Sequence, residues 1–165
     1  DWRRKVEEEA EQCTRLYGKF SIIGFSMGCL LAAYAANRYP VERVVLLNAP
    51  VIYFSPKRYV EFFWEKFRKR DFSHFTRAAK VPHRAVLQFI RMAGRLRKEF
   101  HRLRQPSLIC QSGRDQIIHP RSADYLMRVI PGEKRLVVFP RSRHVICWDV
   151  EVDELLQEIK EFLLN

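Results

Sequence analysis

The hydrophobic positions of this chain form short apolar runs, separated by stretches with helical periodicity. Four of the runs are rich in β-branched and aliphatic residues and are long enough for buried strands. They occupy residues 20–23, 43–47, 107–111 and 135–139. Because the runs are apolar on both faces and alternate with helical segments, the pattern predicts a parallel sheet covered on both sides. The predicted fold class is α/β.

The segments around these runs have the spacing of amphipathic or buried helices. In residues 1–17 apolar side chains recur at three- and four-residue steps, and Gly18 follows as a C-cap glycine. Residues 29–36 are rich in helix formers, and residues 124–127 lie in a further helix. From Val152 onward, apolar residues share one helical face. The pattern therefore predicts helices on either side of the strands and at both ends of the chain.

The segment 55–105 interrupts the alternation of strands and helices. It contains no convincing strand, and its spacing favours two or three helices. In the last of these, an apolar stripe runs from Val86 to Leu103, with arginines and lysines off the stripe. We expect this segment to be a helical lid inserted into a single domain, between the core portions 1–54 and 106–165.

The composition and the cysteine spacing indicate the domain size and the cellular compartment that we expect. The chain of 165 residues, with 47% hydrophobic and 30% charged residues, is long enough for one domain with a substantial core. No apolar run approaches the roughly 20 residues that span a bilayer, and no basic-then-apolar leader opens the chain. The four cysteines show no paired or metal-like spacing. We therefore expect a cytoplasmic protein in which Cys29 and Cys110 are buried thiols.

The net charge of +11 arises in the middle segment alone. Between Lys57 and Arg104 there are 15 lysines and arginines and four acidic residues, and the rest of the chain is balanced. Such a basic helical face can contact anionic lipid headgroups, attract anionic small molecules or simply be solvated. We expect no nucleic-acid partner, because no recognised nucleic-acid-binding motif accompanies the charge.

The sequence GFSMG, residues 24–28, stands between the first predicted strand and its helix. A G-x-S-x-G in this setting predicts a nucleophile elbow, a tight turn that lifts the Ser26 hydroxyl above the sheet. The positive end of the following helix lies beneath that hydroxyl. We expect glycine at positions 24 and 28 because larger side chains would collide in so tight a turn. The alternative is a glycine-rich turn that only packs a helix against a sheet.

A nucleophilic serine needs a base, and the base needs an orienting carboxylate. Asp115 follows the strand 107–111 and His144 follows the strand 135–139, at the ends where open parallel sheets place their chemistry. The alternatives are a turn-forming Asp115 and a surface His144. Other histidines and carboxylates fit the two roles less well: His74, His83, His101, His119, Asp124 and Asp149.

Three features together resemble the α/β-hydrolases. They are the elbow with its helix, the GRDQII loop at 113–118, and the sequence His144-Val145-Ile146 before the terminal helix. Within that fold the chain is most similar to small bacterial carboxylesterases related to monoacylglycerol lipases, over essentially its whole length. The resemblance implies Ser26 as nucleophile, His144 as general base and acid, and Asp115 as the orienting carboxylate. It also implies short-chain esters or monoacylglycerols as substrates, with no metal or cofactor.

The substrate site is expected beside the elbow. The N–H of Met27 can provide one donor to the oxyanion of the reacting ester. Aromatic side chains of the elbow and the lid are candidates to wall an acyl pocket. These candidates are Phe25, Phe62, Phe63, Trp64 and Phe89.

One departure from the family concerns the start of the chain. The family has further strands before the helix predicted at 1–17, and one of them supplies a second oxyanion donor from a His-Gly loop. We therefore expect the sequence to be the C-terminal portion of a longer enzyme, with the strand 20–23 at an uncovered sheet edge. A partner covering that edge and a degenerate remnant are alternatives. The competing hypothesis for function is a non-catalytic hydrolase-like module that binds an anionic lipid surface or a protein partner.

Overall fold

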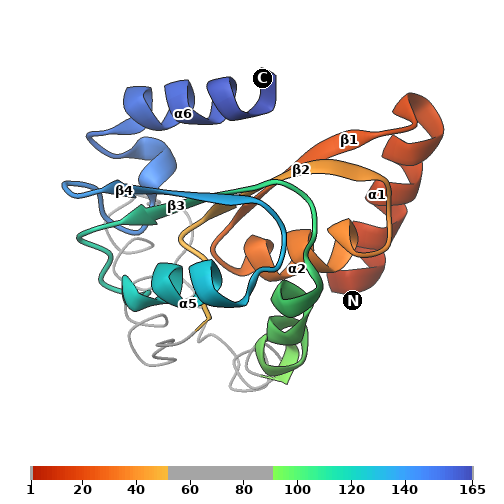
Figure 1. Cartoon of the computed structure of the whole chain (residues 1–165), viewed down its shortest axis with the longest axis horizontal. Coiled ribbons are helices and arrows are strands. Elements are labelled where there is room, and N and C mark those ends of the chain that lie inside the picture. Colours follow the sequence, from red (N-terminus) through yellow and green to blue (C-terminus); the bar gives the residue numbers. More distant parts are fainter. Residues whose placement is uncertain (1, 52–90, 165) are drawn as a thin grey trace, which may run out of the picture.

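A four-stranded parallel sheet in the order β1-β2-β3-β4 forms the centre of the computed structural model, which describes residues 2–51 and 91–164 (Figure 1). The strands are β1 (Phe20–Phe25), β2 (Val41–Leu47), β3 (Ser107–Ser112) and β4 (Lys134–Phe139). Each includes one of the four apolar runs of the sequence. The predicted α/β fold with a parallel sheet is therefore confirmed.

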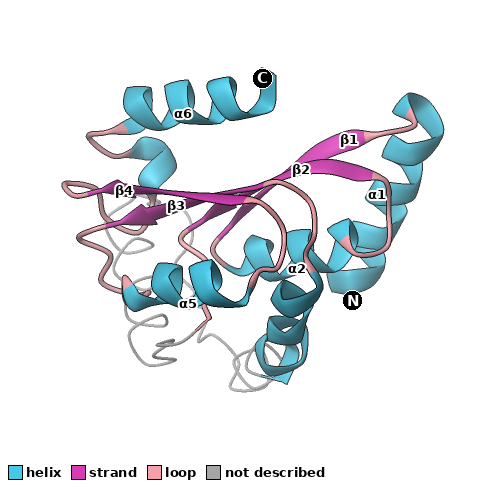
Figure 2. Ribbon diagram, viewed as in Figure 1, coloured by secondary structure: helices cyan, strands magenta, loops and turns pink. Residues whose placement is uncertain are grey.

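Helices cover both faces of this sheet (Figure 2). On one face lie α2 (Met27–Ala36) and α5 (Arg121–Val129), and on the other lies α6 (Val152–Leu164). At one side of the sheet, α1 (Trp2–Tyr17) packs against α2 and β1. The short 3-10 helices η1 (Arg97–Arg102) and η2 (Ile146–Trp148) precede β3 and α6. None of the described helices is long and apolar enough to cross a membrane.

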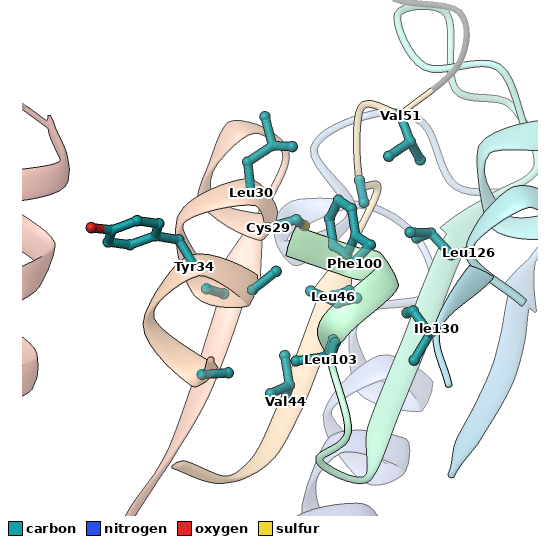
Figure 3. Packing of buried hydrophobic residues seen from close by; sticks show 14 of the residues in the cluster. Cys29, Leu30, Tyr34, Val44, Leu46, Val51, Phe100, Leu103, Leu126 and Ile130 are labelled. Carbon is teal, nitrogen blue, oxygen red and sulfur yellow. The ribbon is translucent and has the colours of Figure 1, made fainter. Parts of the chain in front are cut away.

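The strands are apolar on both faces because the sheet has a hydrophobic core on each side. Successive residues of a strand point to opposite faces. Accordingly, Leu46 belongs to the cluster beneath α2 and α5, whereas Val45 and Leu47 belong to the cluster beneath α6. Figure 3 shows Leu46 among the side chains of the first cluster. The two clusters fix the sheet between its helix layers, and thereby fix the strand ends that carry the polar residues.

The helix after the elbow, α2, is buried around most of its circumference. Every residue from Cys29 to Ala36 is buried. A helix that is apolar all round is stable only inside a protein, and here β1, β2, α1 and η1 surround it. The position of α2 is thus set by packing on several sides, which makes it a rigid support for the residue at its N-terminus.

The close approach of β1 to α2 explains one of the two elbow glycines. A Cβ on Gly24 would lie 2.7 Å from the Cα of Cys29 and 2.7 Å from the carbonyl oxygen of Gly28. The expected crowding is therefore present at Gly24. At Gly28 an added Cβ would meet no atom of the described residues within 4 Å. The prediction that both glycines relieve a collision is wrong for Gly28 within the part of the chain that is described.

The end of the predicted lid segment belongs to the core. Residues 91–96 are helical and lead into η1. Leu96, Phe100 and Leu103 are buried and join the cluster of α2 and α5. Figure 3 shows Phe100 and Leu103 in that cluster. The proposed lid function depends on residues 52–90, which lie outside the described parts of the chain.

The strand β1 occupies one edge of the sheet. Within the described ranges it pairs with β2 alone. The side chain of Ile23 is 50% exposed on the face that α6 covers further along the sheet. The position of β1 at the edge of the described sheet agrees with the expectation for residues 20–23.

All four cysteines are free thiols. Cys29 and Cys110 are fully buried, as predicted. Burial raises the pKa of both thiols, that of Cys110 to about 12. The Sγ atom of Cys29 lies 3.1 Å from the carbonyl oxygen of Gly24 and 3.3 Å from that of Leu47. Cys29 therefore acts as a small packing residue inside the elbow.

Candidate active site

Ser26 occupies a strained turn between β1 and α2. Its backbone has φ 50° and ψ −121°, a combination that non-glycine residues rarely adopt. Hydrogen bonds hold the turn on both sides: the Ser26 N–H donates to the Leu47 carbonyl at 2.8 Å, and the Cys29 N–H donates to the Ser26 carbonyl at 3.0 Å. Such strain persists only where the surrounding structure enforces it, and it is common at functional sites.

The side chains of Ser26, His144 and Asp115 meet at the carboxyl end of the sheet. The His144 Nε2 atom lies 3.1 Å from the Ser26 Oγ, and the His144 Nδ1 atom lies 2.7 Å from the Asp115 Oδ2. The His144 ring and the Asp115 carboxylate are buried. When Nδ1 carries a proton and donates it to the carboxylate in a hydrogen bond, Nε2 is the nitrogen that can accept the serine hydroxyl proton. The structure therefore aligns a hydroxyl, an imidazole and a carboxylate in series.

Both oxygens of Asp115 are held in place. The Oδ1 atom accepts the backbone N–H groups of Ile117 at 2.8 Å and Ile118 at 2.9 Å. The Oδ2 atom faces His144. The carboxylate thus forms the local turn that the sequence offered as an alternative, and it also contacts the imidazole. The turn fixes the direction in which the second oxygen points.

Two carboxylates beyond the catalytic candidates hold the loop that carries His144. Glu151 Oε2 accepts the Ser142 hydroxyl at 2.6 Å and the Arg141 N–H at 3.0 Å. Burial acts to raise the pKa of Glu151, but these hydrogen bonds outweigh it and bring the pKa below its usual 4.5. Asp149 Oδ2 accepts the Arg143 N–H at 2.8 Å. The approach to His144 is therefore tied to the segment before α6.

The structure describes two of the remaining predicted site residues, Met27 and Phe25. Met27 is the first residue of α2, so its N–H is among the helix N–H groups that have no acceptor within the helix. The ring centroid of Phe25 lies 5.2 Å from that of His144. Four aromatic candidates lie outside the described residues: Phe62, Phe63, Trp64 and Phe89.

The competing histidines that the structure describes have other partners. His101 contacts the hydroxyl of Tyr125 at 2.9 Å, and the His119 Nδ1 accepts the Arg121 N–H at 3.1 Å. In the described portion of the chain, no group of three or more His, Cys, Asp or Glu residues could hold a metal ion. His74 and His83 are not among the described residues.

Sequence reasoning missed two residues near the site. Glu151 carries no motif, and only the folded structure shows that it binds the His144 loop. Asn48 follows the apolar run 43–47 directly. A polar residue at the carboxyl end of a buried strand is the signal that could have identified it.

A parallel sheet with a strained serine elbow and a histidine between serine and aspartate defines the α/β-hydrolase class. Residues 69–151 match the model of the family described as serine aminopeptidase, S33, which is half of the chain. The chain belongs to this family. Its curated relatives include the thermostable monoacylglycerol lipase of Bacillus sp. (strain H-257), which is 26% identical over 178 residues, covering 98% of this chain and 69% of the relative. The family match makes the chain a member of a hydrolase family, and this relative is named a lipase.

Solved structures support the same fold. A structure from work on LipS and LipT, two metagenome-derived lipolytic enzymes, superposes with a TM-score of 0.78 at 19% identity, covering 98% of this chain and 71% of that one. The monoacylglycerol lipase of Paleococcus ferrophilus superposes with a TM-score of 0.70 at 18% identity, covering 98% and 73%. The resemblance drawn from the motifs is therefore confirmed at the level of family and fold.

Proposed function

We propose that Ser26, His144 and Asp115 form a catalytic triad that cleaves carboxylic esters through an acyl-enzyme. The observation that carries the proposal is the imidazole of His144, which lies 3.1 Å from the Ser26 hydroxyl and 2.7 Å from the buried carboxylate of Asp115. This arrangement orients the base and stabilises the imidazolium that forms when the base takes a proton. The strained backbone of Ser26 supports the same assignment.

In the acylation step, the Ser26 Oγ attacks the ester carbonyl carbon while His144 Nε2 takes the hydroxyl proton. The carbonyl oxygen becomes an oxyanion that the N–H of Met27 stabilises, assisted by the positive end of α2. When the tetrahedral intermediate collapses, the bond to the alcohol oxygen breaks. His144 gives its proton to that oxygen, so the alcohol leaves neutral and Ser26 remains acylated.

Deacylation repeats these steps with water. His144 Nε2 takes a proton from a water molecule, whose oxygen attacks the acyl carbon of the ester on Ser26. Collapse of the second tetrahedral intermediate returns the proton to the Ser26 Oγ and releases a carboxylic acid. Asp115 remains ionised and keeps the imidazole in one tautomer throughout.

The proposed substrates are short-chain esters or monoacylglycerols. The ring of Phe25 packs beside the imidazole and gives the site an apolar wall, which suits a hydrophobic acyl group. Two of the similar proteins are named monoacylglycerol lipases. The lid aromatic residues proposed for the same wall are Phe62, Phe63, Trp64 and Phe89.

Ester hydrolysis by purified variants tests the triad. The wild type should hydrolyse p-nitrophenyl butyrate and monobutyrylglycerol, and Ser26→Ala should be inactive. Asp115→Asn should lower kcat by about 10⁴-fold because the imidazole loses its orienting acceptor. Ser21→Ala, on the exposed face of β1, is the matched serine control and should keep full activity. Hydrolysis that persists in folded Ser26→Ala would exclude Ser26 as the nucleophile.

The basic segment suggests an anionic membrane surface as a partner. Its apolar positions Leu96, Phe100 and Leu103 are buried in the core, so they are not available to enter a bilayer. The acidic residue of this described part, Glu99, pairs at 3.0 Å with Arg38 of the core, so it does not neutralise the neighbouring cations by a direct ion pair. The described cations are exposed and can act only through charge: Arg91, Arg95, Arg97, Lys98, Arg102 and Arg104.

Vesicle co-sedimentation tests this partner. The protein should sediment with vesicles that contain phosphatidylglycerol but not with pure phosphatidylcholine, and high salt should release it. Replacing Arg91 and Arg95 with Gln should weaken binding. The same charge change at Arg4 and Lys5 of α1 should have less effect. Equal loss from both pairs would mean that net charge alone attracts the protein.

A further inference from the structure

Asn48 lies at the carboxyl end of β2, where it is fully buried. Its backbone has φ 51°, in the left-handed region. Among the described residues, only Ser26 shares a positive φ without being glycine. Asparagine tolerates this conformation better than most residues do, and strain of this kind collects at functional sites. The two strained residues therefore stand at the ends of neighbouring strands.

The side-chain amide of Asn48 joins the other strand ends. Its Nδ2 donates to the His144 carbonyl at 2.8 Å and to the Ser112 Oγ at 2.9 Å. Its Oδ1 accepts the Ser112 N–H at 2.7 Å. The Ser112 hydroxyl in turn donates to the Arg143 carbonyl at 2.8 Å. One amide thus holds the end of β3 and the backbone of His144 together.

Among the side chains, a short amide fits the hydrogen bonds at position 48. The site needs two N–H donors and one acceptor on a short side chain, which is the inventory of asparagine. Aspartate has the acceptor but not the donors, and its charge would face the His144 carbonyl. Glycine allows the left-handed backbone but leaves the buried Ser112 N–H and the His144 carbonyl without these partners.

We propose that Asn48 is a positioning residue that fixes the backbone of His144 so that its imidazole reaches both Ser26 and Asp115. This inference rests on the proposed triad. Each strand of the sheet then contributes to the site: Ser26 follows β1, Asn48 follows β2, Asp115 follows β3 and His144 follows β4. Asn48 is buried beneath the site and acts through His144, without contacting the substrate.

The expected effect is on turnover more than on substrate binding. A misplacement of about 1 Å in a catalytic group can cost about 10²-fold in rate. Asn48→Gly should therefore lower kcat for p-nitrophenyl butyrate by about 10²-fold, with KM changed by less than about 3-fold. Ser112→Ala removes only the hydroxyl part of the network and should lower kcat by a smaller factor. Both variants are assayed alongside urea unfolding, so that rates refer to folded protein.

A matched asparagine provides the control. Asn37 lies at the other end of α2, where its Nδ2 donates to the Glu99 carbonyl at 2.9 Å. Asn37→Ala removes a comparable amide far from His144. It should lower the free energy of unfolding but leave kcat of the folded enzyme unchanged.

Proton NMR gives a readout that does not depend on turnover. The His144 Nδ1–H bound to Asp115 should give a low-field resonance that is absent from Asp115→Asn. Asn48→Gly should broaden or shift this resonance, and Asn37→Ala should retain it. A purely structural role for Asn48 would leave the resonance unchanged in folded protein.

These measurements separate the two proposals. Wild-type kcat and an unchanged resonance in folded Asn48→Gly would overturn the role of Asn48. If Asn48→Gly does not fold, Ser112→Ala is the deciding variant. A wild-type kcat and an unchanged resonance in Ser112→Ala would then overturn the proposed role of Asn48. If the wild type itself hydrolyses no ester, the proposed function fails, and the resonance still tests whether Asn48 positions His144.

Discussion

Replacing Gly24 with Ala should strongly destabilise the elbow, whereas the same change at Gly28 should not. The new Cβ at position 24 would lie 2.7 Å from the Cys29 Cα, 2.7 Å from the Gly28 oxygen and 2.8 Å from the Cys29 N. All three are backbone atoms, so no side-chain rotation relieves the contacts. To reach 3.4 Å, an ordinary contact distance, β1 and α2 must separate by about 0.7 Å. Since α2 is packed on several sides, that shift has to disturb the core.

The magnitude follows from overpacking. Extra atoms in a well-packed core typically cost about 1–3 kcal/mol, and a backbone-only clash belongs at or above the upper end. We therefore expect Gly24→Ala to lower the free energy of unfolding by at least about 3 kcal/mol. Gly28→Ala meets no described atom within 4 Å. Alanine is favoured over glycine in a helix by up to about 1 kcal/mol, so this variant should be as stable as the wild type or slightly more stable.

Urea unfolding followed by circular dichroism measures both values. The rate at which a fluorophosphonate labels Ser26 in the remaining folded protein reports on the elbow itself. It should fall in Gly24→Ala because the shift of α2 moves Ser26 away from His144. Equal stability of the two variants would refute the reasoning from close packing.

Three further predictions concern stability and thiol chemistry. Burial acts to raise the pKa of Glu151, yet its hydrogen bonds keep that pKa below the usual 4.5. The ionised carboxylate therefore stabilises the folded protein fully above about pH 4.5, and this contribution is lost as the pH falls through the lowered pKa of the folded state. In urea unfolding at several pH values, Glu151→Gln should therefore lose less stability on acidification than the wild type, and an identical pH dependence would contradict this. Iodoacetamide at pH 8 should modify Cys13 much faster than Cys29, because burial raises the pKa of Cys29; peptide mass spectrometry that finds equal rates would disprove the difference. Phe100→Ala should lower the free energy of unfolding by about 3–5 kcal/mol, since the ring is fully buried. Leu164→Ala, at a residue that is 75% exposed, should change that free energy by less than about 0.5 kcal/mol. Similar losses of stability in the two variants would show that the core is misassigned.

The strands could be predicted because their pattern is local. A run such as 43–47 is apolar on both faces, and the structure shows why: β2 separates two hydrophobic clusters. Each predicted run falls short of its observed strand by one or two residues, and polar end residues such as Glu42, Ser112 and Lys134 are among those that also join the ladder. The helix α2, which follows Ser26, could also be predicted from the sequence, since its composition fits a buried helix.

The support of the site could not be predicted in the same way. Ser26, Asp115 and His144 stand out because a short motif and the order of strand ends mark them. The hydrogen bonds of Glu151 and Asn48 depend on which loops meet after folding, and no local pattern encodes that. Among the described residues the expected collision at Gly28 is also absent, because whether a Cβ fits depends on the tertiary neighbours of the turn.

Covalent labelling tests the central claim most directly. The 165-residue chain is treated with a fluorophosphonate, and the modified peptide is located by mass spectrometry, with Ser26→Ala as the control. The triad predicts a single modified residue, Ser26, and no labelling of the control. Labelling of another serine in both proteins, or an unreactive Ser26 in a chain shown to be folded, would contradict the assignment of Ser26 as an activated nucleophile.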